Sequence, residues 1–164
     1  MDTIRTAAFI EAVTKLLEEI HVGPPDPRTT WIASNRENSG LLGTLEGISV
    51  RAASTPPGHG LNTIAAHAGH LLYALSLALR SLQGEDAYAG AKWAESWGTQ
   101  TVDEASWQGL RAGLRRVHEG LLAALRTGPV LDDPLVLQGV IALVGHGAYH
   151  LGAIQATLRV LGSG

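Results

Sequence analysis

His146 and His150 lie four residues apart in an apolar stretch near the end of the sequence. On a helix this spacing places both imidazole rings on one face, one turn apart, where they can bind the same metal ion. Zinc proteases use the same spacing in the motif His-Glu-x-x-His. Here Gly147, Ala148 and Tyr149 stand between the histidines, so the catalytic glutamate of that motif is absent. The pair indicates a metal site only if a further ligand comes from elsewhere in the chain.

A second pair, His67 and His70, lies three residues apart in another apolar segment. An unpartnered polar ring in such surroundings costs roughly 1–3 kcal/mol, so two pairs on two core helices favour a metal site over packing. Either residue of the second pair can supply the third ligand. Three neutral imidazoles leave positions open for a water molecule or a substrate anion. The remaining histidines, His21, His59 and His118, are predicted to be solvated or to cap helices.

The elements that must position these histidines are helices. Apolar residues recur at helical spacing in four segments, and neither strand alternation of useful length nor an internal repeat is found. The predicted helices are Thr3–His21, Thr63–Gln83, Val102–Thr127 and Pro134–Leu161. Four such helices predict an all-α fold, namely a four-helix bundle with long connections after its first and second helices.

Capping residues mark several of the predicted helix ends. Asn62 is expected to cap the second helix, and Thr101 with Glu104 forms a capping box before the third. Gly128–Pro129 is expected to end the third helix. Asp133 is expected to cap the last helix, because it precedes a proline at the first helical position, where a missing N–H costs nothing.

The first connection, residues 22–60, is too long to lack secondary structure in a compact domain. Short helical pieces are therefore expected at Leu41–Leu45 and Ser49–Ala53. In the second connection, Trp93 and Trp97 are expected to hold the chain against the bundle.

Glycines are unusually frequent in the last predicted helix. Each weakens an isolated helix by about 1 kcal/mol relative to alanine. Their number predicts close approach by a neighbouring segment or a ligand. The glycines concerned are Gly139, Gly145, Gly147 and Gly152.

The composition of the 164 residues, of which 45 % are hydrophobic, indicates a single domain spanning residues 1–164. Only 16 % are charged, which favours a covered face such as a homodimer interface. A net charge of −3 argues against nucleic-acid binding, and Arg111, Arg115 and Arg116 are expected to form a solvated face.

The most apolar stretch, Leu135–Val144, is shorter than the roughly 20 residues that cross a bilayer. It is expected to be a buried helix. No membrane binding is expected, and the absence of cysteine fits a cytoplasmic protein.

At these residues the chain resembles the DinB/YfiT-like family of metalloenzymes. The similar segments are residues 62–71, residues 146–154, the run Trp93–Trp97 followed by Trp107, and Ser49–Ser54. The family is a four-helix bundle of up-down-down-up type and is often dimeric. Its metal triad consists of a histidine seven residues after the threonine that opens the second helix, and a His-x3-His on the fourth. The resemblance therefore implies His70, His146 and His150 as the metal ligands.

The same resemblance implies a metal-dependent enzyme. Members with known activity resemble thiol-dependent transferases and isomerases, in which the metal activates a low-molecular-weight thiol. Because this chain has no cysteine, any such thiol must be external. We therefore expect one divalent ion per chain (Zn, Ni, Fe or Mn) in a thiol-dependent transferase or a metal-dependent hydrolase that acts on a small molecule. The alternative is a non-catalytic metal-binding or stress-related dimeric bundle protein.

Other side chains near the implied triad bear on its chemistry. His67, Tyr149 and Tyr73 are candidates for residues that support the ligands or act in catalysis, with packing as the simplest role for His67. Many family members carry glutamine three residues after the last histidine. In this sequence Ala153 stands there, so chemistry that depends on that glutamine is not expected.

Overall fold

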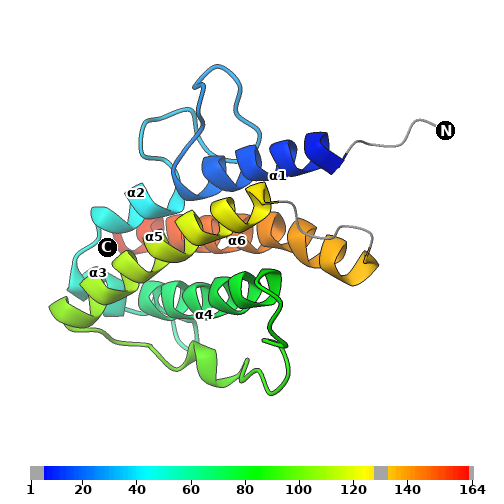
Figure 1. Ribbon diagram of the computed structural model, residues 1–164. Coiled ribbons are helices and arrows are strands. Elements are labelled where there is room, and N and C mark those ends of the chain that lie inside the picture. Colours follow the sequence, from blue (N-terminus) through cyan, green and yellow to red (C-terminus); the bar gives the residue numbers. More distant parts are fainter. Residues whose placement is uncertain (1–5, 128–132, 163–164) are drawn as a thin grey trace.

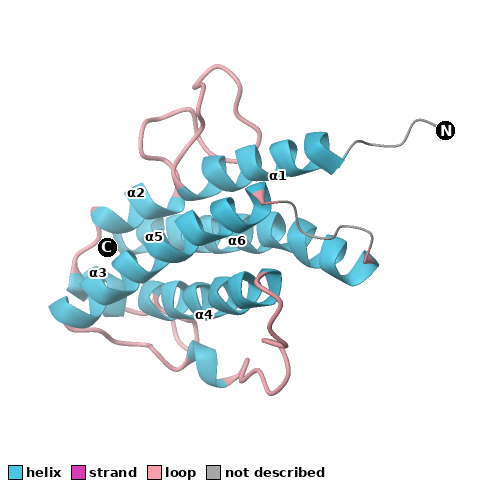
Figure 2. Ribbon diagram, in the orientation of Figure 1, coloured by secondary structure: helices cyan, strands magenta, loops and turns pink. Residues whose placement is uncertain are grey.

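The computed structural model describes residues 6–127 and 133–162, and all regular structure within them is helical (Figures 1 and 2). The all-α prediction is therefore confirmed. The helix start at Thr3 and the helix stop at Gly128–Pro129 lie outside the described residues. The long helices are α1 (Thr6–His21), α4 (Ile64–Leu82), α5 (Glu104–Arg126) and α6 (Pro134–Gly162). The short elements are α2 (Leu41–Glu46), α3 (Val50–Ser54) and a 3-10 turn (Glu95–Trp97).

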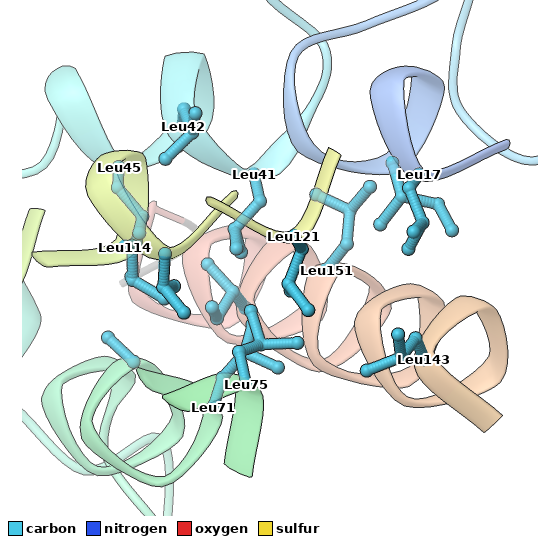
Figure 3. Packing of buried hydrophobic residues seen from close by; sticks show 14 of the residues in the cluster. Leu17, Leu41, Leu42, Leu45, Leu71, Leu75, Leu114, Leu121, Leu143 and Leu151 are labelled. Carbon is cyan, nitrogen blue, oxygen red and sulfur yellow. The ribbon is translucent and has the colours of Figure 1, made fainter. Parts of the chain in front are cut away.

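The four long helices pack around one shared core. α4 contacts both α5 and α6, whereas α1 contacts α6 and α5 from the other side (Figure 1). Leucine side chains from five helices meet in this core (Figure 3), among them Leu17, Leu41, Leu71, Leu75, Leu114, Leu121 and Leu151. Burial of a leucine side chain contributes roughly 1.5–3 kcal/mol. The apolar stripes of the helices therefore hold α4 and α6 side by side, and these are the helices that carry the two histidine pairs.

The start of α4 differs from the prediction. The hydroxyl of Thr63 accepts a hydrogen bond from the backbone N–H of Ala66 at 3.2 Å and donates one to the backbone oxygen of Gln100 at 2.8 Å. The side-chain oxygen of Asn62 accepts instead from Nε2 of Gln100 at 2.8 Å. Thr63 is therefore the cap, because Asn62 is engaged by the second connection. These bonds also fix that connection to the first turn of α4.

The predicted capping box of α5 is wrong. The carboxylate of Asp103 caps this helix and accepts from the backbone N–H of Ser106 at 2.7 Å. Glu104 is then the first helical residue, whereas a capping box needs the glutamate at the third. At α6 the prediction is confirmed, since Asp133 accepts from the backbone N–H two residues later at 2.8 Å. Both carboxylates also favour the positive end of the helix dipole.

Glu19 anchors the first connection. Its side chain is almost fully buried, and Oε1 accepts hydrogen bonds from the backbone N–H groups of Trp31, Ile32 and Ala33 at 2.9, 2.7 and 2.8 Å. Three donors compensate the cost of burying a carboxylate. Further along, the two predicted short pieces are confirmed as α2 and α3, with Ser49 serving as the cap of α3.

The glycines of α6 do not share one role. A Cβ at Gly147 would lie 3.0 Å from Cγ2 of Ile20 and 3.4 Å from Nε2 of His21, so α1 approaches closely there. At Gly139, Gly145 and Gly152 a Cβ would meet nothing within 4 Å. A neighbouring segment thus approaches closely at Gly147 and not at the other three, which are exposed. Approach by a ligand at those three positions stays a prediction.

The apolar stretch of α6 is longer and more exposed than expected. The stretch Leu135–Val144 is the first part of a helix that extends over 29 residues. By length and composition α6 would suit a membrane span, a test that core helices of soluble proteins also pass. Its most apolar window is 28 % buried, which corrects the expectation of a buried helix. α6 packs on α1 and α4, and large apolar residues such as Ile141 and Val160 remain exposed on it.

Candidate metal centre

His70, His146 and His150 come together between α4 and α6. His146 and His150 project from the same face of α6, with their Nε2 atoms 3.0 Å apart. The ring centroid of His70 lies 5.3 Å from that of His146 and 5.2 Å from that of His150. One possible ligand atom from each residue lies within 4.8 Å of the others. The structure thus groups the three histidines that the family resemblance implies as ligands.

Ser96 determines which nitrogen of His70 faces the cluster. Its hydroxyl donates to the backbone oxygen of Trp93 at 2.6 Å, and its oxygen lies 2.7 Å from Nδ1 of His70. Because the hydroxyl proton is already used, Ser96 accepts from His70, whose Nδ1 therefore carries the proton. The Nε2 lone pair of His70 is left to bind a metal. The sequence did not predict this role of Ser96, because a serine in an irregular connection belongs to no recognisable spacing pattern.

His67 stands behind His150. The Nδ1 atoms of the two rings are 3.1 Å apart, while Nε2 of His150 faces His146. A histidine that binds a metal through Nε2 carries its proton on Nδ1, so with an ion bound there His150 would donate to His67. His67 can accept this bond only as a neutral ring. The contact favours a supporting role for His67 over packing alone.

The 3-10 turn Glu95–Trp97 covers one side of the histidine cluster. The indole of Trp97 stacks on His70 with centroids 4.0 Å apart and an interplanar angle of 16°, and it lies 5.6 Å from His150. Trp93 lies 6.1 Å from His70. The two tryptophans hold the second connection against α4, as predicted. His146 is only partly buried, so the cluster is more open on its side.

The two tyrosine candidates occupy different environments. The hydroxyl of Tyr73 accepts from the backbone N–H of Lys92 at 2.7 Å, and its ring meets Trp93 edge-on at 5.7 Å. Tyr73 therefore holds the second connection in place. Tyr149 is 60 % exposed, and its ring lies edge-on to His150 at 5.0 Å. Of the two, only Tyr149 lies at the rim, where it can touch a bound small molecule.

The DinB superfamily model matches residues 35–154 of the chain. The chain belongs to the DinB superfamily. The matched segment contains the three clustered histidines together with Ser96 and Trp97. No curated protein and no solved structure matches the chain at a significant level. The family resemblance seen in the sequence is thus confirmed, and the chemistry of this DinB protein has to be argued from its own site.

Burial keeps the clustered histidines of this DinB protein neutral. Desolvation, with added repulsion from His146, His67 and His70, lowers the pKa of His150 to about 3. Desolvation also lowers the pKa of His67, His70 and His146. Neutral imidazole is the form that binds metal ions. At neutral pH, protons therefore compete little for the ligand atoms.

The cluster in this DinB protein fits one divalent ion. Nitrogens that bind one tetrahedral zinc ion at about 2.0–2.1 Å lie about 3.4 Å apart. Separations of up to 4.8 Å therefore require the rings to close in by about 1 Å when an ion binds. Within the described residues only histidines join the cluster, which suits several divalent transition metals. With Ala153 in place of the family glutamine, the hydrogen bonds that orient the clustered rings come from Ser96 and His67.

The prediction that His21 and His118 are solvated or cap helices is wrong. Their side chains are 1 % and 5 % exposed, and their Nδ1 atoms lie 2.8 Å apart between α1 and α5. Each ring supplies the other with a hydrogen-bond partner, and the missing side chain at Gly147 makes room for His21. Burial of the pair depends on contacts between distant segments, which the sequence pattern does not contain. His59 is exposed, as predicted.

Proposed function

We propose that this DinB protein is a metal-dependent enzyme of the four-helix-bundle type, which binds one divalent ion through His70, His146 and His150. The main support is the convergence of three neutral imidazoles from two helices, two of them oriented by their own hydrogen-bond partners. Packing does not require such convergence, because each polar ring costs free energy when buried without a partner.

The difference between the two sides of the cluster supports catalysis over a structural ion. Trp97 covers the inner side, whereas His146 is partly exposed and Tyr149 lies at the rim. Three protein ligands leave coordination positions free, as catalytic zinc sites do, while structural sites use four ligands. A small molecule can therefore approach from the side of His146.

A divalent ion in this site would lower the pKa of a bound thiol or water and so supply a nucleophile at neutral pH. Because the chain has no cysteine, the thiol is a cosubstrate. Trp97 keeps bulk water from the inner face of the site, and His67 holds the proton on Nδ1 of His150. The Tyr149 hydroxyl can donate a hydrogen bond to the substrate at the rim. The reaction is thiol transfer to an electrophilic small molecule, or hydrolysis of one.

Metal content is the first test. Untagged protein is expected to contain about one metal ion per chain by elemental analysis, or to take one up when incubated with zinc, nickel, iron or manganese. The His146→Ala variant is expected to lose it. His59→Ala is the matched control, because His59 is exposed and outside the cluster. Wild-type protein that binds none of these metals would overturn the proposal.

Activity separates the two reaction classes. Metal-loaded protein is incubated with electrophilic small molecules, with and without low-molecular-weight thiols. Turnover only with thiol indicates a transferase, and turnover without thiol indicates a hydrolase. Either activity is expected to be lost in His146→Ala. Absence of turnover in a metal-loaded protein whose ion has no free position would favour the alternative, a non-catalytic metal-binding protein.

We also propose that the protein is a cytoplasmic homodimer that binds neither nucleic acid nor membranes. Large apolar side chains exposed on α6 away from the cluster and the groove support a covered face, namely Ile141 and Val160. Light scattering coupled to size exclusion is expected to give twice the mass of one chain, and a monomer at all concentrations would refute the dimer.

A further inference from the structure

An apolar groove lies between α4 and α6, beside the histidine cluster. Its volume is about 490 Å³, within the range of small-molecule sites. α4 lines it with Ala78, Ser81 and Leu82, and α6 lines it with Gly139 and Leu143, among others. None of the lining residues carries a charged side chain. The groove therefore suits an uncharged, apolar group.

The groove follows the same helix faces as the metal ligands. Ala78 comes eight residues after His70 on α4, and Leu143 comes three residues before His146 on α6. At 1.5 Å per residue, its near edge lies roughly 5–12 Å along the helices from the cluster. Ala142 and Leu143, which line the groove, precede His146 by about one turn of α6. A ligand bound at the cluster therefore needs to extend by only a few bonds to reach the groove.

Aromatic rings line the same route on the side of the second connection. Tyr88, a lining residue of the groove, stacks on Trp93 with centroids 6.3 Å apart. Trp93 in turn lies 6.1 Å from His70. One apolar wall therefore leads from a metal ligand to the groove, and it carries no group that would repel a hydrocarbon chain.

We infer that the groove binds the apolar tail of an amphipathic substrate whose head group ligates the metal ion. The substrate class is an uncharged alkyl chain that carries a thiol or another metal-ligating head. The role of the head rests on the proposed function, whereas the tail site rests on the shape and composition of the groove.

Alkyl hydroxamates of increasing length test this inference, because the hydroxamate head ligates metals and only the tail varies. Calorimetric titration of zinc-loaded protein with the series from acetohydroxamate to octanohydroxamate is expected to show about fourfold tighter binding for each methylene that enters the groove. Gly139→Leu, which fills the groove, is expected to abolish this gain and to leave acetohydroxamate binding unchanged. Gly109→Leu is the matched control, since Gly109 is an exposed position on α5 with nothing within 4 Å.

The outcomes distinguish a failure of the tail site from a failure of the proposed metal site. If acetohydroxamate binds but affinity does not rise with chain length, the tail site is refuted while the proposed function stands. If the protein binds no metal, the proposed function fails. The groove of the metal-free protein is then titrated with octan-1-ol, and binding is measured by NMR from the chemical shifts of the backbone amides of Ala78 and Gly139. Shifts that Gly139→Leu removes then support the tail site, and no shifts refute it. If Gly139→Leu breaks a dimer and no tail binds, the groove is an interface between copies and the inference is wrong.

Discussion

The Nδ1 atoms of His67 and His150 lie 3.1 Å apart, on the side of the His150 ring that faces away from His146. With a metal on Nε2, the proton of His150 would lie on Nδ1, where His67 is placed to accept its hydrogen bond. We predict that His67→Phe, which removes the acceptor but keeps a buried ring, lowers metal affinity by about 10–100-fold. Competition with a chromophoric chelator measures the affinity.

His67→Gln separates orientation from packing. Its side-chain oxygen can still accept from His150, so affinity is expected to recover much of the loss seen with His67→Phe. Circular dichroism of the metal-free variants checks that both are folded. An equal loss in both variants would show that the shape of the ring matters, and not its hydrogen bond.

Ser96 is expected to act on His70 in the same way. Ser96→Ala leaves Nδ1–H of His70 without its acceptor and is predicted to weaken metal binding by about 10–100-fold. Ser96→Thr keeps the hydroxyl and is predicted to bind nearly as wild type. The control is Ser76→Ala, since the hydroxyl of Ser76 donates within α4 to the backbone of Leu72. Unchanged affinity in Ser96→Ala would remove Ser96 from the site.

The buried pair His21–His118 predicts a pH dependence of stability. Desolvation, with added repulsion from His118, lowers the pKa of His21 to about 3, against about 6.5 in the unfolded chain. Between these values the unfolded chain binds one more proton. The free energy of unfolding therefore falls as the pH falls, by about 1.4 kcal/mol per pH unit from this residue. Above pH of about 6.5 its contribution is fully present.

Urea unfolding of the metal-free protein at several pH values measures this slope. His21→Phe is expected to reduce it by about 1.4 kcal/mol per pH unit, while His59→Phe, at an exposed position, leaves it unchanged. His150 has a similarly lowered pKa and contributes equally to wild type and variants. The same slope in His21→Phe and wild type would contradict the prediction.

Two glycines of α6 are predicted to respond oppositely to alanine. At Gly147 the new Cβ would lie 3.0 Å from Cγ2 of Ile20, a fully buried, β-branched side chain that cannot easily move. Gly147→Ala is therefore expected to destabilise the protein by roughly 1–3 kcal/mol. At Gly145 nothing lies within 4 Å, so Gly145→Ala is expected to stabilise it by up to about 1 kcal/mol. Thermal unfolding of the metal-free variants compares them, and changes of the same sign would refute the contrast.

Much of the local structure follows from the sequence alone. Apolar spacing locates the four long helices, and the length of the first connection predicts the short helices α2 and α3, whose bounds agree to within a residue. The pair His146 and His150 is also local, because any helix places residues four apart on one face. The caps at Asn62 and Thr101 were mispredicted, because several polar residues stand at each helix start. At α4 a bond from Gln100, distant in the sequence, engages Asn62, whereas at α5 the neighbouring Asp103 makes the local capping bond.

The sequence by itself determined that two helices each carry a pair of histidines, and that one pair shares a face. Only the tertiary structure decided how the rotation of α4 against α6 brings His70 to the cluster and His67 behind it. It also decided that Ser96 orients His70 and that His21 is buried. The physical reason is the separation in sequence over which each effect acts. Helix periodicity acts over three or four residues, whereas burial and hydrogen-bond partners depend on the packing of segments that are far apart in the chain.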